Sequence, residues 1–95
     1  MPDEAANAWT VLWTHEGMRS LRRVPPRVLP AIMSFAHERL AVNPLRATHR
    51  LNPPLDRYRS VSVGSFRVLI EVNSKELIIY VVKVADHADV YRPRP

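Results

Sequence analysis

VGSFRVLIEV, residues 63–72, is the stretch that decides the fold: a glycine turn followed by an alternating strand. Successive side chains of a strand point to opposite faces of a sheet. One face of this strand carries only apolar side chains, namely Phe66, Val68, Ile70 and Val72. The opposite face carries Arg67 in its middle. This arrangement predicts a sheet with one face buried by helices and the other partly open, with Arg67 on the open face.

Two further strands flank this one. RYRSVSV (57–63) precedes it and predicts a hairpin that turns at Gly64-Ser65, while LIIYVVKV (77–84) follows a second turn at NSKE (73–76). The last strand is apolar on both faces, as is typical of a central strand. In the first strand, alternation places Ser60 and Ser62 on one face and Arg59 on the other.

The N-terminal half predicts one strand and two helices. AWTVLWT (8–14) is rich in β-branched and aromatic residues, and its Thr14 is suited to cap a short helix over 15–24 whose apolar stripe is Met18, Leu21 and Val24. Pro25 and Pro26 then start a second helix, which the Asn-Pro pair at 43–44 ends. Residues 45–56 contain two adjacent prolines and no clear period, so we expect a loop carrying Arg46, His49 and Arg50.

Together these elements predict a fold of the α+β class. Its order is β-α-α-β-β-β, a four-stranded, mostly antiparallel sheet with two helices packed on one face. A chain of 95 residues with no internal repeat or long linker predicts a single domain over residues 1–95.

Composition narrows the function. The chain has no cysteine, and its formal net charge is +5, with twelve arginines among fourteen basic residues. This balance favours an anionic partner, although a GC-rich genome, whose codons favour arginine, explains the composition equally well. No spacing of histidines and carboxylates suggests a metal site, so we expect no metal and no cofactor. The sequence shows no signal peptide or membrane-spanning run, which predicts a cytoplasmic protein that does not bind membranes.

Several segments, in this order and spacing, resemble the RelE/ParE superfamily of bacterial toxins over roughly residues 9–92. They are WTVLWT, the corner LRRVPPR, the Asn-Pro pair, the strand VGSFRVLIEV, and the ending HADVYR, which is similar to that of the YafQ-like branch. The resemblance implies a toxin of a type II toxin-antitoxin system with a cognate antitoxin as partner, and contact with operator DNA only through the antitoxin complex. In the RelE branch, it implies a metal-independent endoribonuclease that cuts mRNA on the ribosome by attack of the 2′-hydroxyl.

The resemblance also implies a catalytic set of three residues. Arg67 matches the arginine that stabilises the phosphate, His87 the acid-base histidine, and Tyr91 an aromatic residue that stacks on or orients the nucleotide. Substrate contacts are expected from a wider, mostly basic set, namely Arg46, Arg50, Arg57, Arg59 and Ser62. An ordinary surface ion pair between Arg67 and Glu71 is the competing interpretation.

One departure keeps other functions open. Relatives that cut mRNA often carry basic residues at alternating positions of the first hairpin strand. Aligning on the Tyr-Arg pair places Arg59 there, whereas aligning on strand faces places Ser60 and Ser62 there, and the face argument has the better physical basis. Arg59 then leans toward the helix layer. The missing cations favour a ParE-type DNA gyrase inhibitor, or a weakened homologue that mainly binds antitoxin, over the nuclease.

Overall fold

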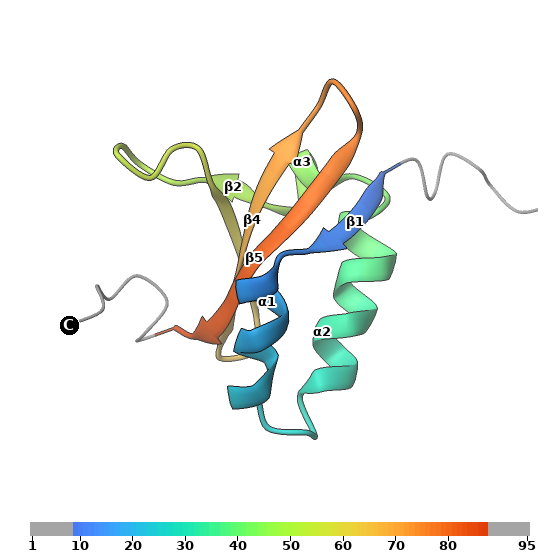
Figure 1. Cartoon of the computed structure of the whole chain (residues 1–95), viewed down its shortest axis with the longest axis vertical. Helices are drawn as coiled ribbons and strands as arrows, with labels where there is room; N and C mark the ends of the chain where they lie inside the picture. Colours follow the sequence, from blue (N-terminus) through green and yellow to red (C-terminus); the bar gives the residue numbers. More distant parts are fainter. Residues whose placement is uncertain (1–8, 88–95) are drawn as a thin grey trace, which may run out of the picture.

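The computed structural model describes residues 9–87, which form a five-stranded sheet in the order β1–β5–β4–β3–β2 (Figure 1). β1 runs parallel to β5, and all other neighbouring strands are antiparallel. The elements are β1 (Thr10–Trp13), α1 (His15–Ser20), the 3₁₀ turn η2 (Leu21–Arg23), α2 (Leu29–Phe35), the π-helical η3 (Ala36–Leu40), α3 (Pro44–Ala47), β2 (His49–Arg50), β3 (Arg59–Val63), β4 (Phe66–Asn73) and β5 (Ile78–Asp86). The predicted α+β class, with helices on one face of a mostly antiparallel sheet, is confirmed.

The core lies between the sheet and the helix layer of α1, α2 and η3. Ile32 and Leu40 of the helices are at most 1% exposed and pack against Val68, Ile70 and Val81 of the central strands. The apolar face of β4 is thus the buried one, as its alternation predicted. No helix within residues 9–87 is both long and apolar enough to cross a membrane.

The helical predictions need three corrections. The first helix ends at Ser20, and Met18 is 56% exposed, so it is not part of a buried stripe. The second helix begins at Leu29 rather than at Pro25, because residues 25–28 form a turn first. It continues beyond Phe35 as a π-helical turn to Leu40.

The segment expected to be a loop contains two short elements, so a prediction of four strands was wrong by one. The Asn43 side chain accepts a hydrogen bond from the Arg46 backbone N–H, with Pro44 at the start of α3. An asparagine cap followed by proline is a helix start, so the Asn-Pro pair begins α3 as well as closing the helix before it. β2, at His49–Arg50, then pairs with β3 and forms the edge of the sheet.

The two predicted hairpin turns are confirmed. Val63 pairs with Phe66 across a two-residue turn, in which Gly64 has φ of +61°. Glycine adopts this left-handed conformation without steric cost. In the second turn, the Asn73 side chain accepts hydrogen bonds from the backbone N–H groups that follow it.

A β-bulge in β5 changes which side chains reach the open face. Ile70 pairs with Val81, but Leu69 pairs with Lys83, so Val82 is an extra residue on β5. An inserted residue reverses the alternation beyond it. Val81 and Val84 are therefore both buried on the helix side, and Lys83 lies on the opposite face.

Candidate functional site

The centre of the site is a contact between Arg67 of β4 and His87, the residue after β5. The Arg67 Nη2 atom lies 2.9 Å from the His87 Nε2 atom, although the residues are 20 positions apart. The β4–β5 register places Arg67 opposite Ala85, two residues before His87. The backbone N–H of His87 donates to the Ser65 carbonyl over 3.0 Å and fixes the chain at the end of the hairpin. The two groups predicted to share a phosphate thus lie together on the open face.

The chemistry of the two groups sets the direction of the contact. A guanidinium group has only hydrogen-bond donors, so Arg67 Nη2 donates and His87 Nε2 accepts. The Arg67 Nε atom is buried and has no hydrogen-bond partner within residues 9–87. Nε and Nη2 lie on one edge of the guanidinium plane, the edge that binds a phosphate with two parallel hydrogen bonds.

The registers settle where the hairpin serines lie. Ser62 is directly opposite Arg67, and Ser60 is opposite Leu69, so both serines share the face of Arg67. The alignment based on strand faces is therefore correct, and the one that put Arg59 on this face is not. Ser62 is exposed beside the pair, whereas Ser60 is fully buried.

Arg59 is held on the helix side of the sheet, as the alternation predicted. Its Nε donates to the Thr48 hydroxyl over 2.9 Å, and its Nη2 donates to the carbonyls of Leu45 and Thr48 over 3.1 and 3.0 Å. These acceptors lie at the end of α3, where helix carbonyls need partners. The guanidinium is thus engaged in closing α3, on the face opposite Arg67.

The other predicted contact residues lie away from the pair. Arg57 forms an exposed ion pair with Glu71 at 3.0 Å, and this carboxylate raises the pKa of the arginine. Glu71 therefore pairs with Arg57 and not with Arg67. Arg46, in α3, and Arg50, in β2, are exposed near the opposite edge of the sheet. Tyr91, the third predicted catalytic residue, lies outside the described residues.

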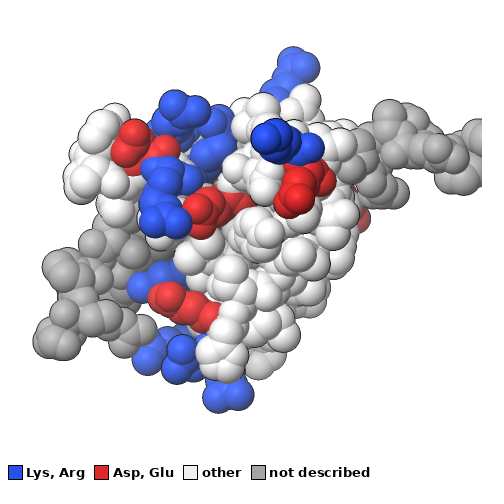
Figure 2. Space-filling view, turned by 45° about the horizontal axis from the view of Figure 1, so that its top comes forward, with Lys and Arg blue, Asp and Glu red and all other residues white. Residues whose placement is uncertain are grey.

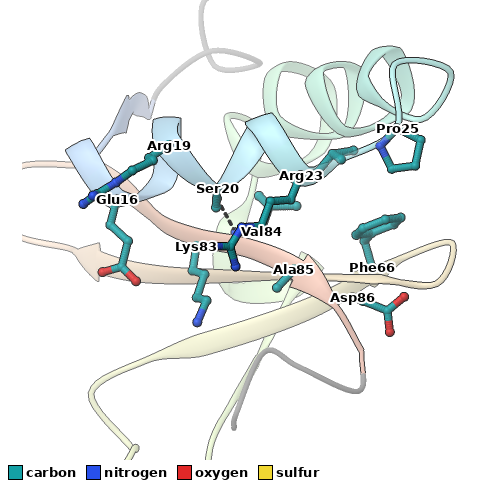
Figure 3. A pocket seen from close by; sticks show the side chains of 11 residues that line it. Glu16, Arg19, Ser20, Arg23, Pro25, Phe66, Lys83, Val84, Ala85 and Asp86 are labelled. Atoms are coloured by element: carbon teal, nitrogen blue, oxygen red, sulfur yellow. Dashed lines mark hydrogen bonds between the residues drawn. The ribbon is translucent and has the colours of Figure 1, made fainter. Parts of the chain in front are cut away.

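A groove of about 810 Å³ adjoins the site at the end of β5 (Figure 3). Arg19 of α1 and Arg23 of η2 line one side, and Lys83 and Ala85 of β5 line the other. The groove lies where β1 ends opposite Val81 and leaves the next part of β5 without a neighbouring strand on that side. There the Ser20 hydroxyl accepts a hydrogen bond from the Val84 N–H over 2.9 Å.

Charge alone does not single out a surface. Lys and Arg side chains gather in several groups with acidic side chains between them (Figure 2). Two carboxylates, Glu16 and Asp86, also line the groove beside its basic residues. Within residues 9–87, no three His, Asp or Glu side chains come together as a metal site. The geometry of Arg67 and His87 is therefore the feature that defines the site.

Lys83 is a residue that the sequence predictions did not include. In the series Ile79, Val81, Lys83, the first two positions are buried, so an uninterrupted strand would bury the lysine as well. A charged residue in a series of core positions is the available signal of a register change. The bulge at Val82 is the change that this signal indicates.

Solved structures with the same fold include bacterial and archaeal toxins and toxin-antitoxin complexes. The toxin-antitoxin complex RelBE2 from Mycobacterium tuberculosis contains a chain with 31% identity and a TM-score of 0.79, covering 85% of this chain and 93% of that one. The isolated Escherichia coli RelE toxin has a TM-score of 0.67 over 82% of this chain and 83% of its own, at 12% identity, which shows the fold alone. The fold is thus that of the RelE-type toxins.

Sequence comparison gives the family. The model for the ParE toxin of the type II toxin-antitoxin system parDE matches residues 11–91, so the chain belongs to this toxin family within the RelE/ParE superfamily. A curated relative, Toxin RelG of Mycobacterium tuberculosis, is 32% identical over 84 residues, which is 88% of this chain and 97% of that protein.

Proposed function

We propose that this toxin is a metal-independent endoribonuclease that cuts mRNA on the ribosome and so stops translation. The observation that carries the proposal is the 2.9 Å contact between Arg67 and His87 on the open face of the sheet. An arginine and a histidine are the cation and the proton-transfer group that cleavage by a neighbouring hydroxyl needs. The 32% identity to Toxin RelG also favours a RelE-type activity.

In the proposed reaction, the ribose 2′-oxygen forms a bond to the adjacent phosphorus, and the bond from phosphorus to the 5′-oxygen breaks. The products are a 2′,3′-cyclic phosphate and a 5′-hydroxyl. The scissile phosphate takes the place of the imidazole against Arg67, whose Nε and Nη2 donors then bind two phosphate oxygens. These donors stabilise the charge that develops on the phosphate in the transition state.

His87 has the proton-transfer role. The acid in this reaction is the imidazole in its protonated form, which takes its proton from solvent. The imidazolium gives its proton to the leaving 5′-oxygen, while the proton of the 2′-hydroxyl goes to solvent. Ser62, exposed opposite Arg67, is placed to donate one neutral hydrogen bond to the substrate.

The test is to map the 5′ ends of transcripts after induced expression, in parallel with a purified translation reaction. We expect new ends within codons, only in translated messages and only when ribosomes are present. A His87→Gln variant keeps a polar side chain of similar size but has no imidazole to transfer a proton. We expect this variant to leave transcripts intact and growth normal. Cleavage by this variant at the wild-type rate would overturn the role of His87, and intact transcripts with the wild type would overturn the proposal.

A cognate antitoxin is the proposed protein partner. The matching structures from Mycobacterium tuberculosis and from Pyrococcus horikoshii are complexes of a toxin with its antitoxin. We expect this chain to bind an antitoxin in the cytoplasm and to reach operator DNA only through that complex. Coexpression with the product of the adjacent gene, followed by purification of a stable complex, tests this. An adjacent gene product that neither binds the toxin nor restores growth would argue against it.

A second candidate function is inhibition of DNA gyrase, which the match to the ParE toxin family favours. The absence of basic side chains at Ser60 and Ser62 favours it too, or favours a homologue whose main role is antitoxin binding. Double-strand breaks with intact transcripts would identify the gyrase inhibitor. Normal growth at high expression would identify the weakened homologue.

A further inference from the structure

We propose that Lys83 binds a backbone phosphate of the RNA next to the scissile one, and that it supplies from β5 the second cation that β3 lacks. This inference rests on the proposed nuclease function. It assigns to the open face a fourth functional group, after Arg67, His87 and Ser62, and this group comes from neither of the strands that carry Ser62 and Arg67.

The sheet register places Lys83 close to the pair. Lys83 is opposite Leu69, and Ala85 is opposite Arg67, so Lys83 lies two residues from the partner of Arg67 on the same face of β5. Such residues are about 7 Å apart along a strand. This is comparable to the spacing of consecutive phosphates in an extended nucleic acid strand. His87 is two residues beyond Ala85 in the opposite direction, so the small alanine separates the two polar groups.

The bulge brings Lys83 to this face. Without Val82 as an extra residue, Lys83 would continue the buried series of Ile79 and Val81 and face the helices. The lysine is half-buried, and within residues 9–87 its ammonium group makes no hydrogen bond or ion pair. The ammonium group is therefore available to an anionic ligand, which it attracts by its charge.

The groove supplies a path for the strand beyond Lys83. Figure 3 shows the Lys83 side chain pointing away from α1, while Arg19 and Arg23 come from the opposite wall. An RNA backbone that leaves Arg67 along β5 would pass Lys83 and then enter this groove. Such phosphate contacts position a strand without reading its sequence.

Protection of the sheet edge is the competing role. After Val81, β5 has no strand neighbour on its β1 side, and lysines on exposed edges prevent pairing with other chains. In this role, the charge of Lys83 would prevent pairing at the β5 edge whether or not RNA binds. It therefore predicts aggregation without any loss of RNA binding when the charge is removed.

The experiment measures binding to a single-stranded RNA that carries a 2′-O-methyl group on every ribose, so that the strand cannot be cut by 2′-hydroxyl attack. Fluorescence anisotropy is recorded across a salt series for the wild type and for Lys83→Met and Lys83→Arg. Lys75→Met, in the turn before β5, is the matched control. We expect Lys83→Met to weaken binding several-fold and to lower the salt slope by about 0.7, the value for one contact to a single strand. Lys83→Arg should restore both quantities, and Lys75→Met should change neither.

Three outcomes separate the inference from the function on which it rests. Equal RNA binding by Lys83→Met and the wild type would overturn the inference, even if the wild type cuts mRNA on ribosomes. Aggregation of Lys83→Met with unchanged binding by its soluble fraction would also overturn it and would assign the lysine to edge protection. A wild type that binds RNA through Lys83 but cuts no transcript would instead refute the nuclease function.

Discussion

Arg59 and Arg67 lie on neighbouring strands of one hairpin, yet the two faces of the sheet give them different surroundings. On the helix side, Arg59 donates to one hydroxyl and two carbonyls at the end of α3. On the open side, Arg67 contacts only His87 through one nitrogen, and its buried Nε has no partner within residues 9–87. The residue type is the same, so the availability of hydrogen-bond donors distinguishes a structural arginine from one that can bind a ligand.

The two faces of the sheet should therefore differ in the property that a substitution alters. Changes on the helix side should alter the free energy of unfolding, and changes on the open side should alter RNA cleavage. A variant that alters both quantities, or a variant on one face that alters only the quantity assigned to the other face, would contradict this division.

The largest expected effect is that of Arg67→Ala on cleavage. Removing one positioned donor from a transition-state anion site lowers a rate by about 10²–10³-fold. We expect this loss in single-turnover cleavage of mRNA on ribosomes, with thermal unfolding close to that of the wild type. Arg59→Ala is the matched control, and it should cut at the wild-type rate per folded molecule. Equal losses of cleavage in the two variants would remove the distinction between the faces.

The next effect concerns α1 on the helix side. A methyl group added to Gly17 would overlap the backbone carbonyl oxygen of Val81, which cannot move aside as a flexible side chain could. We expect Gly17→Ala to destabilise the protein by about 2–3 kcal/mol, as overpacked sites do. Met18→Ala, at the exposed neighbour, should stay within about 0.5 kcal/mol of the wild type. Chemical denaturation of both variants measures this, and an unchanged midpoint for Gly17→Ala would mean that α1 does not lie this close to β5.

A smaller effect is expected when Arg59 loses its hydrogen bonds but keeps its length. We expect Arg59→Met to lower the free energy of unfolding by about 1–2 kcal/mol, because Leu45 and Thr48 lose a donor shared between their carbonyls. Arg59→Lys should recover part of this loss. Denaturant titrations provide the measurement, and no loss in Arg59→Met would show that α3 is closed without the arginine.

Local patterns were enough to predict much of this arrangement. The alternation of β4 separates Arg67 from Val68 and Ile70, and Gly64 marks the turn that pairs Ser62 with Arg67. Period-2 patterning works here because one face is buried, so a shift of one residue would expose the whole core set.

The remaining features depend on interactions between distant segments. The bulge adds one residue to β5, and no glycine or proline marks it in the sequence. The only local signal is Lys83, a charged residue in a series of core positions. His87 reaches Arg67 because of this insertion, since uninterrupted alternation from Val81 would turn it toward the helices. The prediction that these groups converge came from the family resemblance, whereas the structural cause is the bulge.

The smallest effect is expected at Arg57, which is on the open side but pairs with Glu71. Its Glu71 hydrogen bond, followed by their charge attraction, raises the pKa of Arg57. A raised pKa of a cation contributes stability below the ordinary arginine pKa and loses it only as the pH rises through the higher value. Stability due to this pair should therefore be constant between about pH 6 and 9, where arginine stays charged. Because exposed ion pairs are screened by solvent and salt, we expect Arg57→Gln to leave both unfolding and cleavage unchanged. Slower cleavage by this variant, measured as for Arg67→Ala, would extend the RNA contact surface along β4 to Glu71.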